Sequence, residues 1–129
     1  MSLSDKYPCP CCGYLVFDGP PGSYDCCKIC FWEDDASQLR FLDRSGANFT
    51  SLIEAQKNFA RFGASDERSL SHVHEPLPSE TREPGWRPVE PSRDLPRRAA
   101  PGERYVPDTL DYPDDMTALY YWRPTFWRR

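Results

Sequence analysis

The sequence predicts a small α+β protein: a knuckle–hairpin–knuckle ribbon, one packed helix, and a Pro-rich extended C-terminal region. Its 129 residues leave room for one domain of ordinary size. Fourteen Pro and a hydrophobic share of 39% leave little material for a large aliphatic core. All six Cys lie between Cys9 and Cys30, and a core this small needs a staple of that kind.

Two Cys-x-x-Cys pairs predict the ribbon, Cys9/Cys12 and Cys27/Cys30. Clustered Cys favour a metal site, because disulfide scaffolds usually spread their Cys along the chain. Four thiolates on two tight turns supply the tetrahedral coordination that Zn²⁺ prefers. We therefore expect a structural zinc ribbon with these four Cys as ligands. Iron could take the same ligands, and the spacing leaves that alternative open.

A hairpin is expected between the two pairs. Residues 14–17 form a β-prone run, residues 18–22 are rich in Gly and Pro, and residues 23–26 can return as a second strand. Pro10 and Gly13 suit the tight turn of the first pair. The second pair lacks both residue types, so we expect other contacts to hold its turn.

Cys11 and Cys26 are left over from the two pairs. We expect them to be small residues packed beside the site, since free Cys is among the most buried residue types. The alternatives are reactive thiols or ligands of a second metal. A markedly lowered pKa at either thiol would favour a thiol oxidoreductase.

The segment after the ribbon predicts one helix at about residues 52–62. Ser51 and Glu54 form a capping box, and Gly63 ends the helix. An apolar stripe at helical spacing consists of Leu52, Ala55, Phe59 and Phe62. We expect this stripe to pack on the ribbon as core.

Other polar residues give weaker signals. Glu33, Asp34 and Asp35 are expected as a solvated turn, or as the N-cap of a short helix at 36–42, rather than as a site for a cation or a basic partner. Trp32 is expected to shield the thiolates from water.

Catalytic signals are scarce. His72 and His74 are the only two His, and alternate residues of an extended chain point opposite ways, so we expect neither a metal nor a catalytic role. The sequence contains no Ser/His/Asp constellation, P-loop or dinucleotide fingerprint, so an enzymatic function has no support.

The C-terminal half changes character. Residues 76–113 contain nine Pro, which excludes a long helix or a central strand and predicts a strap or a linker. Seven aromatic residues follow within 105–129, and so much ring surface is expected to dock. We therefore divide the chain into a ribbon domain at 1–75, a strap or linker at 76–113, and an aromatic docking tail at 114–129.

Charge narrows the classes of partner. Twenty acidic against sixteen basic residues give a net charge of −4, so a nucleic-acid partner is unlikely. No apolar run is long enough for a membrane span, and the N-terminus lacks the apolar stretch of a signal peptide. A cytoplasmic location is expected.

Several runs are similar to those of one known family: residues 7–14 (YPCPCCGY), 20–24 (PPGSY) and 27–35 (CKICFWEDD). The chain resembles the bacterial cysteine-rich CPCC family over roughly 5–84, with Lys28 where Pro is usual and Cys26 as an extra thiol. The resemblance implies a small zinc-ribbon-like protein with no established activity, and genes placed beside toxin genes.

The function expected from these observations is a non-catalytic, zinc-binding protein–protein interaction module. Its most specific version is an immunity-type protein that neutralises a bacterial toxin. The alternatives are a nucleic-acid-binding zinc ribbon, which the acidic charge disfavours, and a thiol oxidoreductase.

Overall fold

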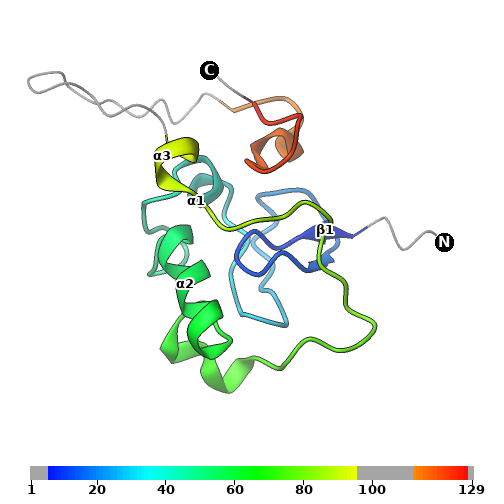
Figure 1. Cartoon of the computed structure of the whole chain (residues 1–129), viewed down its shortest axis with the longest axis vertical. Helices are drawn as coiled ribbons and strands as arrows, with labels where there is room; N and C mark the ends of the chain where they lie inside the picture. The colour runs from blue at the N-terminus through cyan, green and yellow to red at the C-terminus, as the bar shows by residue number, and fades with distance from the viewer. Residues whose placement is uncertain (1–5, 96–111, 128–129) are drawn as a thin grey trace, which may run out of the picture.

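A computed structural model describes residues 6–95 and 112–127 of the chain. The fold is α+β, with a two-stranded antiparallel sheet and short helices. In chain order the elements are β1 (Tyr7–Pro8), β2 (Leu15–Phe17), α1 (Ala36–Arg40), α2 (Leu52–Phe62), the 3₁₀ helix η2 (Glu67–His72), α3 (Pro91–Asp94) and the 3₁₀ helix η3 (Met116–Leu119). In Figure 1, α2 stands beside the loops that carry the Cys residues.

The predicted hairpin pairing is wrong. β2 pairs with β1, in a register that places Tyr7 opposite Phe17, and the first Cys pair lies in the bend between the two strands. Residues 23–26 do not pair with β2. They instead form an isolated bridge between Cys26 and Glu33, across the second Cys pair. Each knuckle is therefore closed by its own local pairing.

The helix predicted from the capping box is present as α2. The Ser51 Oγ accepts a hydrogen bond of 3.1 Å from the Glu54 amide, which satisfies one donor of the first turn. Gly63 ends the helix with a φ of +84°, and its amide donates to the Phe59 carbonyl. Leu52 and Ala55 of the predicted stripe are fully buried, so α2 faces the core as expected.

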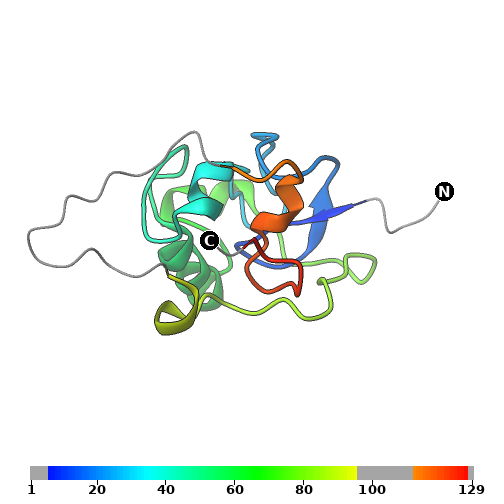
Figure 2. The same ribbon diagram turned by 90° about the horizontal axis from the view of Figure 1, so that it is seen from above.

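The core is centred on the cysteines and is completed by aromatic residues from both ends of the chain. Five Cys, Trp32, Tyr120 and Tyr121 all belong to one buried cluster. The expectation that the tail docks can be followed for residues 112–127, where η3 packs on α1. Figure 2 shows this C-terminal segment lying between α1 and β1. Tyr105 lies outside the described residues.

The Pro-rich segment crosses the ribbon as an extended strap over residues 76–95 (Figure 1). Its first hydrogen bond to the ribbon joins the Leu15 amide to the Thr81 carbonyl at 2.9 Å. Within this strap the only helix described is α3, of four residues. The division of the chain at residues 75 and 113 stays a prediction.

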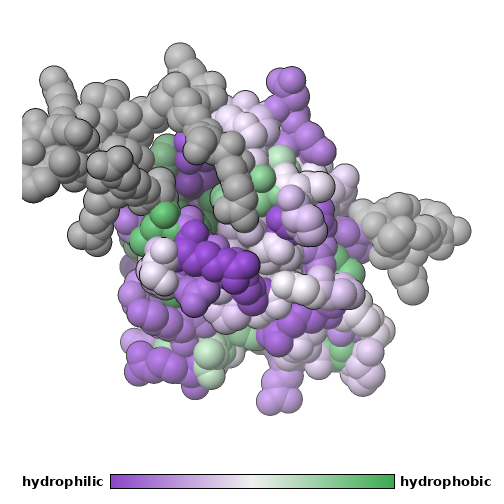
Figure 3. All heavy atoms as spheres, turned by 45° about the horizontal axis from the view of Figure 1, so that its top comes forward, coloured by the Kyte–Doolittle hydropathy of each residue, from purple (hydrophilic) through white to green (hydrophobic). Residues whose placement is uncertain are grey.

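On the part of the surface that Figure 3 shows uncovered by grey atoms, hydrophobic residues form small areas among hydrophilic ones. Among the residues described, no helix has the length and apolar character needed to cross a membrane.

Candidate metal centre

The first knuckle is a tight turn held by backbone hydrogen bonds. The Cys9 amide donates to the Tyr14 carbonyl at 2.8 Å, and the Gly13 amide donates to the Cys9 carbonyl at 2.6 Å. Gly13 has a φ of +82°, in the left-handed region that favours glycine. This geometry turns Cys9 and Cys12 toward the same side of the bend.

The second knuckle repeats this pattern without a glycine. The Cys27 amide donates to the Trp32 carbonyl, and the Phe31 amide donates to the Cys27 carbonyl, both at 2.8 Å. Phe31 takes the place of Gly13 and adopts a φ of +68°. A backbone of this kind costs a bulky residue about 1–2 kcal/mol. The Phe31 ring stacks on the His72 ring, with 4.7 Å between the ring centroids. This stack is one of the contacts expected to hold the turn of the second pair.

The two knuckles bring the four predicted sulfurs together. The Sγ atoms of Cys9 and Cys30 are 3.6 Å apart, and those of Cys12 and Cys27 are 3.8 Å apart. All four ligand atoms lie within 4.8 Å of one another, and all four residues are fully buried. Tetrahedral zinc–sulfur bonds of about 2.3 Å would separate the sulfurs by about 3.8 Å. The four cysteines are therefore positioned to bind a metal ion.

The electrostatics of the cluster also suit a cation. Burial raises the pKa of Cys9 and Cys30, because a buried thiolate loses its hydration. The pKa of Cys27 is lowered, because the thiols of Cys12, Cys30 and Cys9 donate to its sulfur. Four thiolates together in this core would need the positive charge of a bound metal.

Comparison with known proteins supports this description. The model of the Cysteine-rich CPCC family matches residues 7–80, which include both knuckles, α1, α2 and η2. The chain belongs to the cysteine-rich CPCC family. No curated protein matches the chain. In this CPCC protein the match ends before Arg82 and Trp86 of the strap, which donate hydrogen bonds to carbonyls of the first knuckle.

The two additional thiols of this CPCC protein lie in different surroundings. Cys11 is fully buried in the core, as expected, whereas Cys26 is exposed, so the expectation that it packs beside the site is wrong. Burial raises the pKa of both thiols, and the carboxylates of Glu33 and Asp25 raise that of Cys26 further. The lowered pKa that would favour a thiol oxidoreductase is found at neither.

Replacing both extra thiols, as Cys11→Ser with Cys26→Ser, should leave the metal content unchanged, because each knuckle keeps its Cys-x-x-Cys pair. Cys11→Ser alone should lower the free energy of unfolding by about 1–3 kcal/mol, since it buries a hydroxyl. Cys26→Ser should change it by less than about 0.5 kcal/mol. Elemental analysis and urea unfolding measure both effects. Loss of half the metal or more in the double variant would contradict the ligand assignment.

The acidic run after the second knuckle is mostly buried. Asp35 is the N-cap of α1, where its Oδ1 accepts from the Ser37 amide at 2.9 Å. Asp34 accepts from both the amide and the hydroxyl of Ser23. The prediction of an N-cap is confirmed. The prediction of a solvated turn is wrong for Asp34 and Asp35, because both are buried and their carboxylates accept hydrogen bonds from protein donors in place of water.

The two histidines contact different parts of the chain. His72 stacks on Phe31, whereas the Nδ1 atom of His74 lies 3.9 Å from the Glu80 carboxylate. Trp32 is buried in the same cluster as the cysteines, a position consistent with the shielding expected of it.

Four side chains hold the first knuckle from outside, one of them through a neighbour, and sequence reasoning singles out only Tyr121 among them, as one of the docking aromatics. We call them the knuckle clasp: Gln56, Arg82, Trp86 and Tyr121. The Pro10 carbonyl accepts hydrogen bonds from Gln56 Nε2 at 2.9 Å and from Trp86 Nε1 at 3.1 Å. The Arg82 Nε donates to the Cys12 carbonyl at 2.9 Å.

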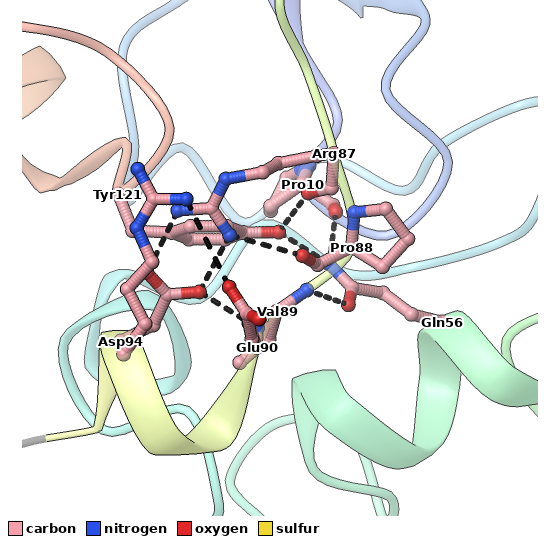
Figure 4. Close-up of polar contacts among 9 residues, drawn as sticks. Pro10, Gln56, Arg87, Pro88, Val89, Glu90, Asp94 and Tyr121 are labelled. Carbon is pink, nitrogen blue, oxygen red and sulfur yellow. Dashed lines mark hydrogen bonds and ion pairs between the residues drawn. The ribbon is translucent and has the colours of Figure 1, made fainter.

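Tyr121 connects the clasp to the strap. Its hydroxyl accepts from Gln56 Nε2 at 2.9 Å and donates to the Arg87 carbonyl. Figure 4 shows Gln56 reaching from α2 toward both Pro10 and Tyr121. Arg87 in turn forms two hydrogen bonds to Asp94, of 2.7 and 2.8 Å. The only local sequence signal was the place of Gln56 on the buried side of the predicted helix.

Gly13→Ala should lower the free energy of unfolding by about 2–4 kcal/mol. A Cβ atom there would lie 2.6 Å from the Trp86 ring, on a backbone that disfavours side chains. Gly63→Ala is the matched control, because Gly63 has a similar φ of +84° and no atom within 4 Å of its Cβ position. It should cost about 1 kcal/mol. Equal losses in urea unfolding would show that Trp86 does not press on the knuckle.

Proposed function

We propose that this protein is a non-catalytic protein–protein interaction module whose core is held together by one zinc ion. The observation that carries the proposal is the closed, fully buried set of four Cys sulfurs. Such a set leaves no open coordination position for a substrate, so the metal would have a structural role. The ligands would be Cys9, Cys12, Cys27 and Cys30.

Zinc is proposed over iron because four-Cys sites on paired knuckles are most often zinc sites. Elemental analysis of protein purified from zinc- and iron-supplemented cells should give close to one zinc per chain. A protein that carries iron under both conditions would contradict the choice of zinc but not the site.

The more specific version of the proposal is a bacterial, cytoplasmic protein that neutralises a toxin by binding it. None of the six Cys forms a disulfide, which suits a reducing compartment. The net charge of −4 favours a basic protein as the partner over a nucleic acid. Immunity itself is proposed on the gene neighbourhood that the family resemblance implies.

The test of the immunity role is growth rescue. The open reading frames next to this gene would be expressed singly in a bacterial host, each with and without this protein. One neighbour should arrest growth, and this protein should restore it while Cys27→Ser, which removes a proposed ligand, should not. Failure of the intact protein to restore growth against any toxic neighbour would contradict the immunity role.

A further inference from the structure

A second surface feature lies beside the second knuckle, away from the knuckle clasp. It is an open groove of about 250 Å³ between the knuckle, the loop at 47–50 and η2. We call it the knuckle groove, and its lining includes Cys26, Phe31, Glu33, Phe49, Arg68 and His72.

The groove presents aromatic surface to solvent. The Phe49 side chain is 77% exposed, more than any other large hydrophobic residue described. The Arg68 guanidinium lies over its ring at 4.1 Å from the centroid and also pairs with Asp66 at 3.1 Å. The Phe49 ring is thus held in place by Arg68, whose charge is balanced by Asp66, while most of Phe49 stays accessible to solvent.

The backbone beside the groove is also unusual. Tyr24 and Phe31 are the two non-glycine residues with positive φ among those described, at 61° and 68°. Both are aromatic, each lies two residues before one partner of the bridge between Cys26 and Glu33, and Phe31 lines the groove. Tyr24 is 60% exposed, so burial of its ring does not offset the strain. Strained residues of this kind cluster at functional sites.

The charge of the groove selects a class of partner. The Arg68 charge is balanced by Asp66. Glu33 in the groove and Asp25 beside it form no ion pair within the part of the chain that the structure describes. The groove therefore combines an exposed aromatic ring with unbalanced negative charge.

We propose that the knuckle groove binds a basic protein segment, with an Arg side chain packed against Phe49 and paired with Glu33. Arg is favoured over Lys because its planar guanidinium stacks on rings and pairs with carboxylates at the same time. This inference makes the proposed function more specific. It rests on that function in one respect, which is that the partner is a protein.

The test uses the full chain, loaded with zinc, as bait for a library of random displayed peptides. Basic peptides that contain Arg should be enriched. Titration calorimetry of one enriched peptide should show binding about tenfold weaker to Phe49→Ser and about threefold weaker to Glu33→Gln. Added salt should weaken binding further. Leu77→Ser and Glu75→Gln are matched controls, since both residues are exposed and lie outside the groove; both should bind like the unaltered chain.

Three results would overturn the groove: no enrichment, enrichment of acidic or uncharged peptides, or equal binding to Phe49→Ser and the unaltered chain. The growth assay separates this outcome from the proposed function. If Phe49→Ser restores growth as well as the intact protein does, the proposed binding role of the groove is wrong and the immunity role stands. If basic peptides bind the groove but no growth is restored, the groove stands and the immunity role fails.

Discussion

Removing the proposed zinc ion should unfold the chain. A strong chelator at neutral pH should abolish the near-ultraviolet circular dichroism and the dispersed amide signals, and zinc should restore them. Structural zinc contributes about 10–16 kcal/mol of apparent binding free energy, as much as a domain's entire stability of about 5–15 kcal/mol. The four Cys side chains are buried in the core. Without a metal ion, nothing there would balance the negative charge of four thiolates or compensate for the hydration they lose.

The matched pair for this prediction is Cys27→Ser and Cys26→Ser. The two residues are adjacent, but only Cys27 belongs to the buried cluster. Cys27→Ser should lose the metal and the fold, whereas Cys26→Ser should keep both. A metal-free chain that keeps its dispersed amide signals would contradict the structural role of the metal.

Deleting residues 112–129 should leave a fragment that aggregates. Leu119, Tyr120 and Tyr121 are each at most 2% exposed. Burial of side chains of this size contributes about 1.5–3 kcal/mol each, and the three together rival the stability of a small domain. The deletion also removes the Tyr121 hydroxyl, which accepts from Gln56 of the knuckle clasp. Solubility, zinc content and hydrogen exchange of the fragment test this expectation.

The control for the deletion is Tyr121→Phe, which keeps the ring and removes only the hydroxyl. It should remain folded, and its free energy of unfolding should fall by about 1–3 kcal/mol. The reason is that the buried Gln56 Nε2 loses the Tyr121 hydroxyl as a hydrogen-bond acceptor. A soluble, zinc-loaded deletion fragment would show that the C-terminal segment does not close the core.

What sequence predicted well was local. The capping box at Ser51 and the left-handed Gly63 placed α2, because both signals act within one turn of the helix. The Cys spacing likewise placed four sulfurs in one cluster, because each pair sits on a single tight turn. Within the helix caps and within each Cys pair the interacting groups are three or four residues apart, whereas the two pairs meet across 15 and 21 residues.

Pairing between segments was predicted poorly. The β-prone run at 14–17 had two possible partners, and periodicity carries no information on which one lies beside it. Gln56 and Trp86 meet at the Pro10 carbonyl of the first knuckle, and Tyr121 bonds to Gln56. The three come from widely separated parts of the chain and share no motif. The burial of Asp34 also depended on donors from Ser23, eleven residues earlier in the chain.

The place of the knuckle clasp along the chain has a consequence for biosynthesis. The ribosome completes both Cys pairs with Cys30, but it adds Tyr121 roughly 90 residues later. At about 5–20 residues per second, this interval lasts roughly 5–20 s. During it, the four Cys could take up metal before Tyr121 is buried in the cluster that contains them. Under the proposed structural role of the metal, the ion in a finished chain could exchange only if this cluster opened. A cell short of metal would then lose this protein as it is being made, while finished copies would keep their metal.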